Sequence, residues 1–127
     1  MFEQRALIAG INQIALASAD PPKLADFYRR ALGLTVLFET AGMIFFATGA
    51  ARLMIGPKRP DQPIGGDAVV YFEPSDWSAA EAKIEDAGVA FLHGASVLMR
   101  EPGRELALRP FKDPEGHNLA LLGWRPA

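Results

Sequence analysis

The chain has 127 residues, of which 50% are hydrophobic and 22% are charged, and these values predict one compact domain with its own core. Its formal net charge of −2 leaves no basic excess to neutralise phosphates, so nucleic acid and anionic membranes are poor candidates for partners. The absence of cysteine excludes disulfides, thiolate metal sites and a cysteine nucleophile. The first residues also lack the pattern of a signal peptide, so we expect a cytoplasmic protein.

The first half of the chain predicts a helix between strands. Residues Ile11–Ala17 are rich in β-branched and small apolar side chains, which favours a strand. Asp20 then precedes two prolines, a pattern typical of a helix N-cap and first turn. The predicted helix ends at Gly33 and carries an apolar stripe of Leu24, Phe27, Tyr28, Ala31 and Leu32. Short spacers then predict three strands joined as hairpins, over Leu34–Glu39, Met43–Ala47 and Arg52–Ile55.

A connector and a second run of elements follow. Residues 56–66 contain three prolines and three glycines, so we expect them to leave the sheet and link two halves. Asp76 or Ser78 is the predicted N-cap of a second helix, which ends before Gly88. The apolar stripe of this helix consists of Trp77, Ala80, Ile84 and Ala87. The predicted strands are Ala68–Glu73, Val89–His93, Ser96–Arg100, Leu106–Phe111 and Asn118–Leu122, of which the second and third could be one irregular strand.

The order of elements is therefore βαβββ twice. Two copies of a small unit, each with one exposed sheet face, are expected to pair those faces around a shared cavity. We predict a single α+β domain over residues 1–127. Its first module lies at about 8–57, its linker at 56–66 and its second module at about 67–124.

Two motifs point to a family. Phe27-Tyr28 precedes Leu32-Gly33-Leu34 in the first helix and strand, and residues Asp113–Asn118 read Asp-Pro-Glu-Gly-His-Asn before the last strand. With the repeated βαβββ order, these motifs resemble the vicinal oxygen chelate superfamily, which includes glyoxalase I, bleomycin-resistance proteins and extradiol dioxygenases. The resemblance implies modules with cupped mixed sheets facing a central cavity, and often a homodimer.

Metal-using members of this superfamily place one ligand on the first and one on the last strand of each module. The resemblance puts these positions at Gln13, near Leu53 or Met54, near Val69, and at Ala120. Apolar side chains and a soft thioether supply no donor suited to Mg²⁺, Mn²⁺, Fe²⁺, Ni²⁺ or Zn²⁺. A slip that put Asp67 in place of Val69 would still leave a two-ligand site, so we predict no metal cofactor. Bleomycin-resistance-type members, which bind a drug without a metal, are the nearest precedent.

Three polar side chains are candidates for contacts to a ligand in the cavity. Gln13 shares a strand face with small residues, so its amide could bond a ligand or a neighbouring strand. Tyr71 could line the cavity. Arg109 could anchor an anion if its face of the strand is the cavity side, or form an ordinary ion pair if it is the outer side.

The other candidates are weaker. Phe45 and Met54 give the central strands aromatic and thioether content suited to an adaptable apolar pocket, although plain core packing is also expected of such residues. Glu73 could act as a general base if burial raised its pKa, but its place before Pro74 at a strand end favours exposure. His93 and His117 are interpreted as surface or loop histidines.

We therefore predict a metal-independent protein that binds a small apolar or aromatic molecule. Its expected partners are that ligand and a second copy of the chain. The alternative is a lyase, isomerase or dioxygenase-like enzyme with an unconventional site, using Glu73 or a residue of a partner subunit as its base. A third possibility is a fold used as an interaction module.

Overall fold

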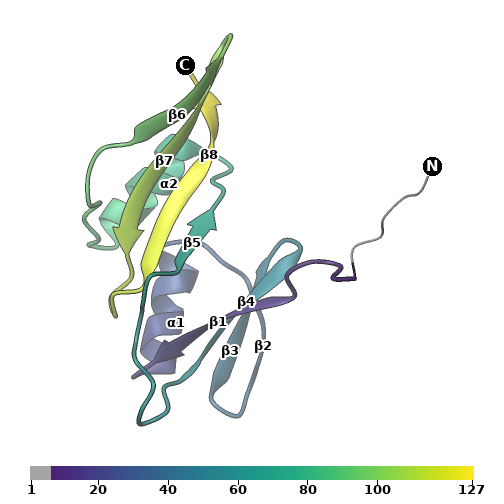
Figure 1. Cartoon of the computed structure of the whole chain (residues 1–127). Coiled ribbons are helices and arrows are strands. Elements are labelled where there is room, and N and C mark those ends of the chain that lie inside the picture. Colours follow the sequence, from purple (N-terminus) through teal and green to yellow (C-terminus); the bar gives the residue numbers. More distant parts are fainter. Residues whose placement is uncertain (1–6) are drawn as a thin grey trace, which may run out of the picture.

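The computed structural model describes residues 7–127 and contains two modules, one above the other in Figure 1. The first module consists of β1 (Gln13–Ser18), α1 (Pro21–Arg30), β2 (Val36–Thr40), β3 (Met43–Thr48) and β4 (Ala51–Pro57). The second consists of β5 (Val69–Phe72), α2 (Trp77–Asp86), β6 (Ser96–Glu101), β7 (Arg104–Lys112) and β8 (Asn118–Pro126). The predicted α+β class and the repeated βαβββ order are confirmed.

Each module forms a four-stranded mixed sheet with the same topology. The strand orders are β1-β4-β3-β2 and β5-β8-β7-β6. In both sheets the first strand pairs parallel with the last, and the other pairs are antiparallel. Residues of the edge strands β1 and β5 line the same cavities, so these two edges face each other across them. We call this boundary between the two modules the seam.

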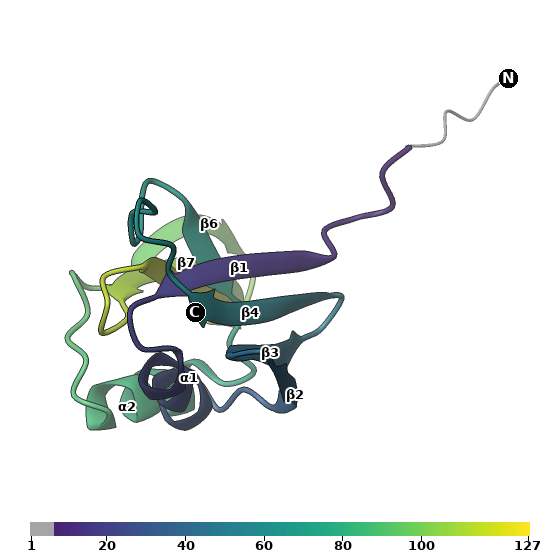
Figure 2. The same cartoon turned by 90° about the horizontal axis from the view of Figure 1, so that it is seen from below.

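The two helices lie on the same side of the molecule, as Figure 2 shows. Asp20 caps α1 as predicted, accepting a hydrogen bond from the backbone N–H of Lys23 at 3.3 Å. The predicted stripe of this helix is buried at Leu24, Phe27, Tyr28 and Ala31. These side chains share one hydrophobic core with both sheets and with Trp77 and Ile84 of α2. No helix within residues 7–127 is long and apolar enough to cross a membrane.

The second helix and the segment after it differ in part from the prediction. Asp76 is the N-cap of α2, accepting from the N–H of Ala79 at 3.0 Å, and Ser78 is not. The predicted strand Val89–His93 is wrong, since the segment is irregular. Leu92 makes a single backbone bond to β7 rather than a ladder, donating to the carbonyl of Pro110 at 3.0 Å. A proline in β7 supplies no N–H in return, so the pairing cannot continue there.

The connector also begins later than predicted. β4 runs to Pro57, which pairs with Ser18 of β1, so the expectation that residues 56 and 57 leave the sheet is wrong. Proline is tolerated at this place because it is the last residue of the strand. The next N–H, that of Lys58, donates to the carbonyl of Ser18 at 2.8 Å and completes the pairing.

Candidate functional site

The strand register divides each sheet into a face covered by a helix and a face without one, which we call the open face. On the covered face of the first module, Ile44, Phe46, Leu53 and Ile55 belong to the core. Phe45 is 6% exposed but lies outside that core, because its ring points to the opposite side of β3. The register places the following residues on the open face of this module: Gln13, Ala15, Ala17, Met43, Phe45, Ala47, Arg52 and Met54.

A group of four residues on this face, the Arg52 platform, consists of Gln13, Phe38, Phe45 and Arg52. The Nε of Arg52 donates to the Oε1 of Gln13 at 2.7 Å, between paired residues of β1 and β4. The two phenylalanine rings are stacked with centroids 4.3 Å apart. The guanidinium carbon lies 4.8 Å from the centroid of Phe45 and 5.6 Å from that of Phe38. The amide oxygen of Gln13 thus bonds a neighbouring strand, the second of its two predicted roles.

Met54 continues the same face. It pairs with Ala15 on one side and with Phe45 on the other. Its sulfur lies over Gly56, where an added Cβ would approach it to 2.9 Å. The predicted candidates Gln13, Phe45 and Met54 therefore share one face, where Arg52, which sequence reasoning had not singled out, links Gln13 to Phe45.

Tyr71 lies on the second module, where it pairs with Ala120. Its side chain is 52% exposed. It lines a cavity of about 460 Å³ at the seam between the sheets, together with Ile14, Leu53 and Glu73. The predicted cupped cavity between two open faces remains a prediction.

Arg109 lies on the covered face of β7 and is engaged by α2. Its guanidinium forms an ion pair with Glu81, its Nε donates to the carbonyl of His93 at 3.1 Å, and it lies 4.0 Å from the ring centroid of Phe91. Of the two roles predicted for Arg109, the structure shows the ion pair. Arg109 therefore lies on the helix-covered face of the second sheet, whereas the Arg52 platform lies on the open face of the first sheet.

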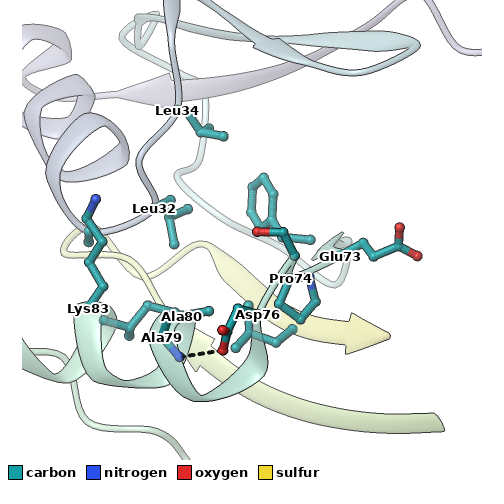
Figure 3. Close-up of a pocket in the computed structure, with 13 residues that line it drawn as sticks. Leu32, Leu34, Glu73, Pro74, Asp76, Ala79, Ala80 and Lys83 are labelled. Atoms are coloured by element: carbon teal, nitrogen blue, oxygen red, sulfur yellow. Dashed lines mark hydrogen bonds between the residues drawn. The ribbon is translucent and has the colours of Figure 1, made fainter. Parts of the chain in front are cut away.

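Glu73 follows the last residue of β5 and is exposed. It borders a pocket of about 300 Å³ on the helix side, between α2 and the segment after α1 (Figure 3). In Figure 3 its carboxylate points away from the other labelled residues, among them Asp76 and Lys83. This placement matches the exposure expected of Glu73.

The residues at the positions implied for a metal do not fit one. Leu53 is 1% exposed in the core, and Ala120 carries no donor. Gln13 is bonded to a guanidinium, whose charge repels a cation. Within residues 7–127, no group of three or more His, Asp or Glu side chains is placed to hold a metal ion.

A buried polar cluster joins the two modules at the seam, and the sequence analysis missed it. Asp113 accepts hydrogen bonds from the hydroxyl of Tyr28 at 2.6 Å and from the Nδ1 of His117 at 2.7 Å. The Nε2 of His117 lies 3.0 Å from the carbonyl oxygen of Ala17. His117 lies in the loop before β8, one of its two predicted places, but it is 4% exposed and therefore not on the surface. His93 is exposed, as predicted.

The turn that carries this cluster makes a second set of hydrogen bonds to the first module, through Glu115. The carboxylate of Glu115 accepts from the N–H of Ala19 at 2.7 Å and from the hydroxyl of Ser18. These contacts hold the end of β1 against the turn that precedes β8. Asp113, Glu115 and His117 of the last motif therefore join the second module to the first.

The environment of Tyr28 predicts how stability depends on alkaline pH. Burial, followed by the charge of Asp113 and the hydrogen bond to it, raises the pKa of Tyr28 well above its ordinary value of about 10. The neutral phenol is thus favoured in the folded state, so this contribution is complete below about pH 10 and is lost above it as the unfolded chain ionises. The slope is at most about 1.4 kcal/mol per pH unit.

We expect Tyr28→Phe to lower the free energy of unfolding by about 1–3 kcal/mol at pH 8, because Asp113 loses a buried donor. The difference from the unmodified chain should shrink above pH 10. Urea denaturation between pH 8 and pH 11 measures both effects. Tyr71→Phe, which removes a hydroxyl from a side chain that is 52% exposed, is the control and should change stability by less than about 0.5 kcal/mol at pH 8. A difference that stays constant to pH 11 would contradict the prediction.

Comparison with known proteins gives a family and a set of similar folds. Residues 10–121 match the Glyoxalase/Bleomycin resistance protein/Dioxygenase superfamily. A comparison with curated proteins gives no significant match. Among solved structures, an integron cassette protein from V. cholerae is similar at 24% identity and a TM-score of 0.74, covering 96% of this chain and 98% of that one.

Two further structures illustrate the range of the fold. A lactoylglutathione lyase from Agrobacterium tumefaciens has 20% identity and a TM-score of 0.68, covering 93% of this chain and 96% of its own. A superfamily member from Sphaerobacter thermophilus has 19% identity and a TM-score of 0.71, covering 93% and 99%. Identities this low relate the folds and leave activities undetermined.

Proposed function

The chain belongs to the Glyoxalase/Bleomycin resistance protein/Dioxygenase superfamily, and we propose that it is a metal-independent protein that binds a small apolar or aromatic molecule. The observation that supports this most is the open face of the first module, where Phe38, Phe45 and Met54 surround one polar pair. Apolar surface with a few placed polar groups is typical of small-molecule sites. Phe38 is 44% exposed and available to a ligand.

The donor chemistry of the same face favours binding without a metal. A guanidinium bonded to Gln13 stands beside the first position at which the superfamily places a metal ligand. Lewis-acid chemistry of the superfamily kind would need oxygen or nitrogen donors there. One form of the enzyme alternative uses Glu73 as its base, and the exposed position of Glu73 past β5 lends that form no support.

A thermal-shift screen of aromatic compounds and divalent metals tests this proposal. A ligand at 100 times its Kd should stabilise the protein by about 2.7 kcal/mol, which raises the Tm of a domain of this size by roughly 5–10 °C. We expect such shifts from aromatic compounds in the presence of a chelator. Ni²⁺, Mn²⁺ and Fe²⁺ should give no comparable shift.

The opposite pattern would sink the proposal. Strong stabilisation by one of these metals, abolished both by chelator and by Gln13→Ala, would indicate a metal site at the family position. The control for nonspecific loss of an amide is Gln62→Ala, since Gln62 lies in the connector, where its amide oxygen accepts from the N–H of Arg59 instead of from Arg52.

The remaining expectations are also proposals. A homodimer is supported by apolar side chains left exposed on the second module: Tyr71 at 52%, Leu98 at 57% and Met99 at 53%. Sedimentation velocity would test it, and a monomer at micromolar concentration would contradict it. The cytoplasmic location rests on the sequence alone.

A further inference from the structure

We propose that the Arg52 platform binds the carboxylate of a small aromatic acid. This inference rests on the proposed function and names the class of ligand. It begins from a contrast among the arginines of residues 7–127. Most of them form ion pairs with Asp or Glu: Arg29, Arg30, Arg100, Arg104, Arg109 and Arg125.

Arg52 is different because it is half-buried and has no carboxylate within ion-pair distance in the described part of the chain. Arg59, which also has none there, is fully on the surface of the connector. Partial burial weakens the hydration of a charge, so a half-buried guanidinium interacts more strongly with an anion than an exposed one does. The site therefore favours an anion more than the protein surface does.

The orientation of Arg52 specifies the shape of that anion. Its Nε donates a hydrogen bond to Gln13, and its guanidinium lies against the rings of Phe38 and Phe45. The two terminal nitrogens keep their parallel N–H donors. A carboxylate matches such a pair with two hydrogen bonds, which a point-like anion cannot do. The group is thus held in place before the ligand arrives, which lowers the entropy cost of binding.

The rings specify the rest of the ligand. Phe38 and Phe45 are stacked, and Phe38 presents its 44% exposed ring beside the cation. An aromatic body bonded to the carboxylate can pack on that ring while its anionic end meets Arg52. Met54, paired with Phe45, extends the apolar surface with an adaptable side chain. One aromatic acid of modest size can therefore reach Arg52, Phe38 and Met54 together, while the buried ring of Phe45 supports them from below.

A matched pair of probes tests the inference: 2-naphthoate and its neutral amide, 2-naphthamide, titrated into the full chain and followed by NMR. We expect the acid to bind at least ten times more tightly than the amide. Arg52→Gln should weaken the acid tenfold or more and leave the amide within twofold. Arg52→Lys, which keeps the charge but loses the fork, should give an intermediate loss.

Arg59→Gln is the matched control, since it removes the same charge from the connector, and it should leave both affinities within twofold. Equal binding of acid and amide, or undiminished binding of the acid to Arg52→Gln, would overturn the inference while leaving the proposed function standing. If neither probe binds at millimolar concentration, this inference is overturned, and the thermal-shift screen decides the proposed function separately. Melting curves of each variant establish that it is folded. If Arg52→Gln does not fold, Arg52→Lys still tests whether the guanidinium binds the acid.

Discussion

Replacing Asp113 with alanine is expected to lower the free energy of unfolding by about 3–5 kcal/mol. Its carboxylate accepts hydrogen bonds from the side chains of Tyr28 and His117 and from the N–H groups of Glu115 and His117. The ring of His117 lies between Asp113, 2.7 Å from its Nδ1, and the carbonyl oxygen of Ala17, 3.0 Å from its Nε2. The variant leaves these buried donors without a partner. Urea denaturation at pH 7 measures the loss.

Two variants separate the cluster from a general effect of losing a carboxylate. Asp61→Ala, in the exposed connector, should change stability by less than about 0.5 kcal/mol. Asp113→Asn keeps an acceptor oxygen and should fall between the alanine variant and the unmodified chain. A loss below about 1 kcal/mol for Asp113→Ala would show that water replaces the carboxylate and that the seam does not depend on it.

Local signals explain why much of the fold could be predicted. The N-cap at Asp20, the prolines after it and the 3.6-residue spacing of the stripe from Leu24 all act within one turn or two, so the sequence alone indicates α1. The ends of the strands could not be predicted from local signals alone. β4 extends to Pro57 because β1 runs beside it, and Val89–His93 is irregular because Pro110 of β7 faces it. Both outcomes depend on a partner distant in sequence.

The candidate site also combines residues that local sequence identifies with contacts that depend on partners distant in sequence. Arg52 and Arg109 are the same residue type on strands of the two modules, and alternation along a strand does not say which face a helix covers. Arg109 forms an ion pair with Glu81 of α2, whereas Arg52 donates a hydrogen bond to Gln13 of β1. His117 was missed for a similar reason, since a histidine after a turn glycine gives no local sign of burial. The signal was the family motif itself, whose Asp113 has its partners in the first module.

Phe45 and Phe46 are adjacent on β3 and should respond differently to substitution, which tests the assignment of the two faces. Phe46 is 0% exposed in the core, with its ring centroid 6.3 Å from that of Tyr28. Phe46→Ala should cost about 3–5 kcal/mol, because it removes a large buried side chain and leaves a cavity. Phe45→Ala should cost less, about 2–3 kcal/mol, because its ring is buried mainly by the stacking on Phe38 and the contact with Arg52, outside the main core.

Binding should respond in the opposite order. Phe45→Ala removes one ring of the Arg52 platform and frees the guanidinium that it holds, so the affinity for 2-naphthoate should fall about tenfold. Phe46→Ala, on the covered face, should leave that affinity within about threefold at a temperature where the variant is folded. Urea denaturation and NMR titration of both variants give the comparison. Equal costs in stability, together with a larger loss of binding for Phe46→Ala, would mean that the ligand lies on the helix side and that the open face is not the site.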